Sequence, residues 1–130
     1  MDYAAIHEMI ANSYWAQGMP PELLKKACLH SICFGAFDGV KQVAVARVVT
    51  DHATYAYLCD VMVHADYRGH GIGKKMMAAI LAHPDLQDLR RFALFTRDAH
   101  GLYKQFGFKA NHMPENYLEI FNGNKFAPKA

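Results

Sequence analysis

The sequence predicts an α/β fold in which one mixed β-sheet carries helices on both faces. Two features of its 130 residues lead to this prediction, a hairpin in the first half and a strand–helix–strand unit in the second. The hairpin is indicated by apolar runs at residues 32–37 and 43–49, which flank the turn signal Asp38-Gly39. Strands joined by so short a turn pair antiparallel.

The strand–helix–strand unit occupies residues 55–95. Residues 55–63 are rich in aromatic and β-branched side chains and predict a strand. Apolar residues then recur at helical spacing from Ile72 until Pro84, which ends the helix. A short apolar run at residues 92–95 predicts the next strand. A helix between two strands normally makes them parallel, so the whole sheet should be mixed.

Three helices and a closing strand complete the expected fold. The predicted helices cover residues 3–16, 20–29 and 99–106. Pro20-Pro21 begins the second helix, and Gly107 is the expected C-cap of the third. The closing strand covers residues 117–121. We expect a single domain over residues 1–121 and a C-terminal tail over residues 122–130.

Composition excludes several classes of protein. A formal net charge of +2 is too small to indicate a nucleic-acid or anionic-membrane partner. The eight histidines lack the spacing of a metal site, so no metal is expected. Cys28, Cys33 and Cys59 form no CxxC pair and are interpreted as reduced thiols. With no signal-peptide pattern at the N-terminus, the sequence predicts a cytoplasmic protein.

A glycine-rich loop, Arg68-Gly-His-Gly-Ile-Gly73, lies between the third predicted strand and the helix that follows it. Helix N-termini bind anions through unpaired N–H groups, and glycine lets an oxygen approach the backbone. The nucleotide P-loop and the dinucleotide fingerprint both fail, because they would need glycine at Arg68 and at Lys74 respectively. From the loop alone, a connection without a ligand stays an open alternative.

Two motifs together resemble the GNAT superfamily of N-acetyltransferases. Arg68-x-x-Gly71-x-Gly73, after Asp60-Val-Met-Val63, resembles its acetyl-CoA-binding motif. About thirty residues later, the stretch from Ala99 to Phe108 resembles its second signature, Leu-Tyr-x-x-x-Gly-Phe. The element order from residue 32 to 121 also matches. The family's first strand is absent or shortened here, since the chain begins almost directly with a helix.

The resemblance implies that acetyl-CoA is the cosubstrate. Its pyrophosphate would lie on the loop amides, and its pantetheine arm would pair like an added strand with the main chain before the loop. Such pairing requires the strands at residues 55–63 and 92–95 to separate. The implied cofactor-binding residues are Val61, Met62, Val63, Arg68, Gly69, His70, Gly71, Ile72, Gly73 and Lys74.

The resemblance also implies catalytic residues. Tyr103 matches the tyrosine that protonates the departing CoA thiolate, and the main-chain N–H near Met62 would polarise the thioester carbonyl. In spermidine/spermine acetyltransferases a basic glutamate stands where this chain has Cys59, which leaves Asp60. Asp60 would deprotonate or bind the acceptor amine. The alternative is a structural salt bridge to Arg47 or Arg97.

Tyr14 and Trp15 are expected to line the acceptor pocket, or alternatively to pack their helix on the sheet. The predicted activity is direct transfer of an acetyl group to a primary amine, most simply a small molecule, within a ternary complex. A protein lysine or N-terminus as acceptor, and an inactive CoA-binding module, are the alternatives. A homodimer is the expected partner state if a sheet edge pairs with another subunit.

Overall fold

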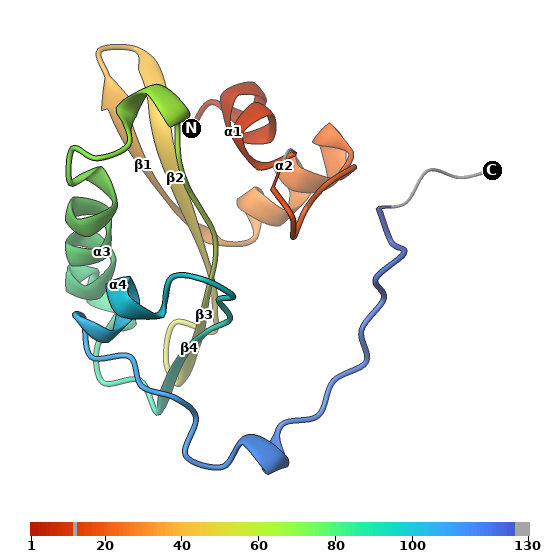
Figure 1. Cartoon of the computed structure of the whole chain (residues 1–130), viewed down its shortest axis with the longest axis vertical. Coiled ribbons are helices and arrows are strands. Elements are labelled where there is room, and N and C mark those ends of the chain that lie inside the picture. Colours follow the sequence, from red (N-terminus) through yellow and green to blue (C-terminus); the bar gives the residue numbers. More distant parts are fainter. Residues whose placement is uncertain (12, 127–130) are drawn as a thin grey trace.

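The computed structural model describes residues 1–11 and 13–126, which form one four-stranded sheet in the order β1-β2-β3-β4 (Figure 1). The strands are β1 (Ile32–Asp38), β2 (Lys41–Thr50), β3 (Tyr55–Val63) and β4 (Arg91–Leu94). β1, β2 and β3 pair antiparallel, whereas β4 pairs parallel with β3. The predicted mixed sheet is confirmed.

Helices cover both faces of this sheet, as predicted (Figure 1). The first pair, α1 (Tyr3–Ile10) and α2 (Pro21–Leu29), packs Ile6, Ile10, Leu24 and Cys28 against Val45 of β2. The second pair, α3 (Ile72–Ala82) and α4 (His100–Lys104), packs Met76, Met77, Ile80 and Tyr103 against Ala46, Val48 and Leu58. Short 3-10 helices occur at Ala65–Tyr67, Pro84–Leu86 and Pro114–Asn116.

The first helix is shorter than predicted. Asp2 caps its start by accepting a hydrogen bond from the Ala5 amide, but the helix ends at Ile10 and not near residue 16. The Ser13 hydroxyl donates to the Ile10 carbonyl at 2.6 Å, and the Ser13 amide donates to the same oxygen at 2.8 Å. These bonds close a turn where the predicted helix would have continued.

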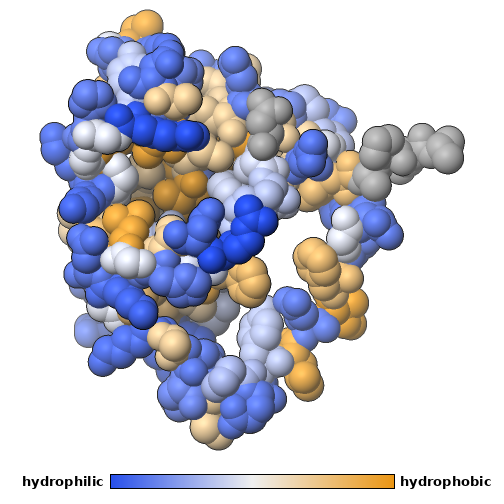
Figure 2. Space-filling model, viewed as in Figure 1, coloured by the Kyte–Doolittle hydropathy of each residue, from blue (hydrophilic) through white to orange (hydrophobic). Residues whose placement is uncertain are grey.

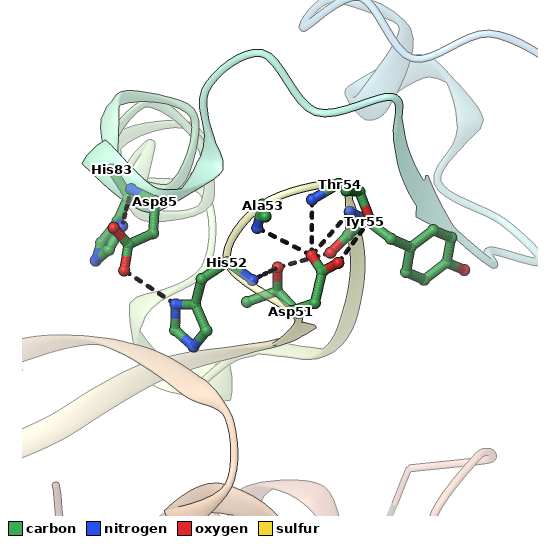
Figure 3. Close-up of polar contacts among 8 residues, drawn as sticks. Asp51, His52, Ala53, Thr54, Tyr55, His83 and Asp85 are labelled. Carbon is green, nitrogen blue, oxygen red and sulfur yellow. Dashed lines mark hydrogen bonds and ion pairs between the residues drawn. The ribbon is translucent and has the colours of Figure 1, made fainter.

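A polar turn joins β2 to β3 and fixes the start of the third strand (Figure 3). The Asp51 carboxylate accepts bonds from the Thr54 hydroxyl at 2.6 Å and from the amides of Ala53, Thr54 and Tyr55 at 2.7–3.1 Å, and these bonds hold its pKa well below the usual range. His52 Nδ1 lies 2.9 Å from Asp85 Oδ2, which links the turn to the segment after α3. The Thr54 carbonyl of the same turn accepts a bond from the Arg91 amide at 3.2 Å, which joins the turn to the start of β4.

The predicted closing strand at residues 117–121 is wrong for the structure described. No strand is formed there, and Leu118, Ile120 and Phe121 are 80–104% exposed. The pattern of the segment is strand-like, but a strand requires a pairing partner, and within residues 1–11 and 13–126 this segment has none. The expected tail at 122–130 is described only as far as residue 126, so its last four residues lie outside the described part.

Across the described ranges, no helix is both long and apolar enough to cross a membrane.

Candidate active site

The C-terminal part of β3, beyond Leu58, has no strand partner on one side within the described chain. β4 pairs with β3 only from Tyr55 to Leu58, whereas β3 continues to Val63. On its other side, β3 remains paired with β2 through Met62 and Val63. The main chain of Val61 and Val63 therefore faces a side of β3 on which no described strand pairs with it, and there the Val63 carbonyl accepts a bond from Arg68 Nε.

A β-bulge lies where the two parallel strands separate. The register of β2 and β3 shifts between Val45 and Arg47, and Asp60 takes the left-handed conformation with φ of 53°. Non-glycine residues adopt this region rarely and at a cost of about 1–3 kcal/mol. Bulges bend and twist a strand, and this one falls just beyond the last β3–β4 pair. It accounts for the opening between the two strands.

The glycine loop leads from the open end of β3 into α3. Gly71 is the N-cap of α3, with φ of 77° and no side-chain cap. The first helical hydrogen bond runs from the Lys75 amide to the Gly71 carbonyl at 3.1 Å, so the amides of Ile72 to Lys74 precede it. Such amides have no partner within the helix. Unpaired amides at a helix N-terminus are the arrangement that anions favour in proteins.

The space in front of the loop is free of protein atoms. A Cβ added to Gly69, Gly71 or Gly73 would meet nothing within 4 Å. Arg68 turns back over β3, where its Nε donates to the Val63 carbonyl at 3.0 Å, while His70 and Lys74 remain exposed. The predicted cofactor residues thus form one continuous path from β3 to the helix, and their backbone fits a pyrophosphate followed by an extended chain.

Tyr103 lies on α4, in the same core cluster as the partly buried Val61 and Val63 of β3. This helix ends at Lys104 with Gln105 as its C-cap, so it is shorter than the predicted 99–106 and Gly107 is not its cap. Gly107 follows with φ of 93°, and the Phe108 amide donates to the Tyr103 carbonyl at 3.3 Å. Burial, followed by the proximity of Tyr14 and Asp98, raises the pKa of Tyr103 above its usual value. The phenol therefore keeps its proton at neutral pH and can act as a proton donor.

Asp60 is held by two side chains. Its Oδ2 accepts a bond from Arg47 Nε at 2.8 Å, and its Oδ1 accepts one from Trp15 Nε1 at 2.9 Å. The Asp60 side chain is only 5% exposed. Of the two interpretations left open by the sequence, the structure contains the salt bridge, and its partner is Arg47. Both carboxylate oxygens of Asp60 are therefore engaged by donors of the protein itself.

Replacing Asp60 by asparagine tests this assignment. We expect the free energy of unfolding to fall by about 2 kcal/mol, because the Arg47 charge loses its partner in a partly buried site. For a chain of this size that corresponds to a melting temperature lower by roughly 5–10 °C. Emission from Trp15, the only tryptophan, should change as its indole N–H loses a charged acceptor.

The matched control for this prediction is Asp66→Asn, since the Asp66 side chain is 80% exposed. That variant should keep the wild-type melting temperature. An unchanged melting temperature in Asp60→Asn, with a raised KM for cationic acceptors, would instead place Asp60 in acceptor binding.

Tyr14 and Trp15 lie in the connection between α1 and α2, and their rings meet edge to face at 5.0 Å. The guanidinium carbon of Arg97 lies 3.8 Å from the centre of the Tyr14 ring. One face of Tyr14 is thus occupied by the protein's own cation. The two aromatic residues predicted for the acceptor pocket are brought together with Asp60 and Arg97, near the end of β4.

Cys59 stands next to Asp60 on β3. Burial raises the pKa of its thiol to about 12, so it is a neutral thiol at physiological pH. A neutral buried thiol is neither a base nor an effective nucleophile.

Arg47 was named from the sequence as a possible salt-bridge partner of Asp60, and the structure confirms that role, whereas the contact of Arg97 with Tyr14 was not predicted. A signal for Arg47 was present, because it is the single charged residue within the apolar run at 43–49. Pairing β2 with β3 places Arg47 opposite Cys59, beside Asp60. Arg97 had no such signal, since its contact with Tyr14 joins distant parts of the chain.

Comparison with known proteins places this architecture among acetyltransferases. A family model described as an acetyltransferase (GNAT) domain matches residues 29–110. A crystal structure from Xanthomonas campestris pv. campestris, of a protein assigned to the GNAT acetyltransferase family, is 44% identical. It superimposes with a TM-score of 0.96 over 98% of this chain and 91% of its own.

Curated relatives agree with this similarity. A Gibberella zeae protein named as an acetyltransferase is 30% identical over 74% of this chain and 66% of its own length. The histone acetyltransferase TAP1 of Glycine max is 32% identical over 73% of this chain and 42% of its own length. The chain therefore spans less than two thirds of either relative.

Proposed function

Because the chain belongs to the GNAT acetyltransferase family, whose members use acetyl-CoA, we propose that it transfers an acetyl group from acetyl-CoA to a primary amine. The acceptor in this proposal is a small-molecule amine, which attacks directly within a ternary complex. The observation that carries the proposal is the open main chain of β3 running into the uncapped N-terminus of α3, with the protonated Tyr103 on the neighbouring helix.

The loop and strand would bind and orient the cosubstrate. The amides of Ile72, Gly73 and Lys74 would donate to the pyrophosphate oxygens, with charge added by Lys74 and by the α3 dipole. The main chain of Val61 to Val63 would pair with the pantetheine amides. Acetyl-CoA supplies the thioester whose acetyl group is transferred.

Three groups of the chain would serve the chemical step. A main-chain N–H near Met62, on the side of β3 that lacks a strand partner, would donate to the carbonyl oxygen as the amine nitrogen bonds to the acetyl carbon and the carbon–sulfur bond breaks. Tyr103 would give its proton to the departing sulfur and regain one from solvent. With Asp60 engaged by Arg47 and Trp15, the amine proton would leave to water. The neutral Cys59 thiol supports direct attack over an acetyl-cysteine route.

The charge around the acceptor site supports an acceptor that carries an anionic group. Arg47 balances Asp60, and in the described ranges no carboxylate lies within ion-pairing distance of Arg97. The end of the site therefore carries an unbalanced cation beside Tyr14 and Trp15. A polyamine would meet repulsion there, whereas an amine with a carboxylate would pair with Arg97.

An acceptor panel tests the proposal. Thiol release from acetyl-CoA should be fastest with small amines that carry a carboxylate, slower with polyamines, and near the no-acceptor rate with lysine peptides. Trp15 fluorescence should change as the preferred amine binds. The name of the Glycine max relative makes histone peptides the essential competing acceptors. Turnover with peptides alone would contradict the small-molecule acceptor, and no thiol release at all would indicate a CoA-binding module.

The contribution of Arg97 is tested by Arg97→Met, which keeps an unbranched side chain over Tyr14 and removes the charge. We expect KM for carboxylate-bearing amines to rise about tenfold or more, because a charge-assisted bond worth about 1.5–3 kcal/mol is lost. The KM for an uncharged amine serves as the internal control and should change little. Equal changes for both acceptors would remove Arg97 from acceptor recognition.

A further inference from the structure

The C-terminal arm, residues 113–121, carries exposed hydrophobic side chains. Tyr117 is 62% exposed, Leu118 90%, Ile120 104% and Phe121 80%. In Figure 2 the arm stands apart from the body of the molecule, with open space between them. Contiguous apolar surface of this kind marks an interaction site.

The arm contacts its own domain at Tyr117, and the chain contacts the domain again at Phe126, beyond the end of the arm. Tyr117 is close enough to Tyr57 on β3 to contribute, after burial and Cys59, to the raised pKa of that phenol. Beyond the arm, the carbonyl of Phe126 lies against Gly18, whose φ of 85° gives the backbone room for this approach. The segment between these two contacts, residues 118–121, is thereby presented away from the domain.

An unpaired strand edge and an exposed apolar face lie next to each other on the sheet. Within the described chain, β4 is the last strand in the sheet order and has one unpaired edge. Val49 and Tyr57 are opposite each other on β2 and β3, on the face that α3 does not cover. Val49 and Tyr55 are each 42% exposed and Phe95 is 78% exposed, so this half of the face is apolar and open. Unpaired edges readily accept another strand.

The arm and the β4 edge match in length and charge. Five extended residues span about 16 Å, which suits a strand the length of β4. The arm contains two acids, Glu115 and Glu119, and no cation. Residues 90–97, around β4, contain three arginines and no acid. Opposite charges favour contact between these two segments.

We propose that the arm of one copy adds as a strand to the β4 edge of a second copy, and that the two copies exchange arms around a two-fold axis. In such an exchange each arm pairs with the β4 edge of the other copy and covers the open face beside it, so the same contact occurs twice. An arm held away from its own domain is a natural donor for exchange.

Light scattering coupled to gel filtration tests the proposal on the full chain. The wild-type protein should show twice the chain mass of 14.6 kDa. The double variant Leu118→Asp/Ile120→Asp should elute as a monomer that keeps the circular-dichroism spectrum of the folded chain, since both side chains are exposed in the single chain. Val40→Asp is the matched control, because Val40 is 98% exposed but lies in the β1–β2 turn, and it should remain a dimer.

Cross-linking then identifies the contact. With p-benzoylphenylalanine in place of Phe121, in a mixture of light and heavy isotope-labelled chains, we expect mixed light–heavy cross-links to the β4 peptide. A monomeric wild-type protein, a dimer that survives the double aspartate variant, or cross-links formed only within one chain would each overturn the proposal.

Discussion

Replacing Tyr103 by phenylalanine is expected to lower kcat about a hundredfold or more, because the variant loses the general acid of the proposed mechanism. The phenylalanine ring keeps the packing of Tyr103 in the core between α3, α4 and the sheet. CoA affinity, measured by calorimetry, should therefore stay at the wild-type value. A loss of kcat without a loss of CoA affinity would identify Tyr103 as a residue that acts on the departing thiolate.

The pH dependence of kcat gives an independent test of Tyr103. Burial raises its pKa, so the phenol stays protonated well into the alkaline range and loses its proton only above the ordinary tyrosine value. Wild-type kcat should fall as the pH passes the raised pKa, and this alkaline decline should be absent in Tyr103→Phe. Tyr3→Phe, on α1 and outside the site, is the control. Near-normal turnover in Tyr103→Phe would transfer the proton-donor role to water or another group.

The features that the sequence predicted well depend on local patterns. β3 begins and ends where its aromatic and β-branched run does, from Tyr55 to Val63. The glycine loop was recognisable because the glycines between Arg68 and Gly73 leave the backbone free of side chains. The opening between β3 and β4 was predicted from the glycine loop together with the resemblance to the GNAT superfamily.

The features that the sequence did not resolve depend on distant contacts. The partner of Asp60 is decided by the register of β2 against β3 and by Trp15, which lies 45 residues away. The pattern at 117–121 is that of a strand, but a strand forms only when another backbone pairs with it. Its failure to pair within the chain is the same property that makes it a candidate for exchange. Local chemistry was therefore predictable, whereas the choice of partner was not.

The glycine loop gives the second large expected effect, and Gly73 is the position that isolates it. Gly71 has φ of 77°, so valine there would be strained and would destabilise the fold by about 1–2 kcal/mol, which would confuse loss of binding with loss of folding. Gly73 lies within the first turn of α3 without a positive φ, and an added Cβ meets no protein atom within 4 Å. Valine is tolerated in a helix at least as well as glycine.

We therefore expect Gly73→Val to retain the wild-type melting temperature while its affinity for CoA falls about tenfold to a hundredfold. That loss corresponds to one charge-assisted hydrogen bond, about 1.5–3 kcal/mol, between a loop amide and the pyrophosphate. Ala78→Val, on an exposed position of the same helix, introduces the same side chain and should leave CoA affinity unchanged. Undiminished affinity in Gly73→Val would mean that the phosphates bind elsewhere, because a branched side chain in the first turn of α3 cannot share that space with them.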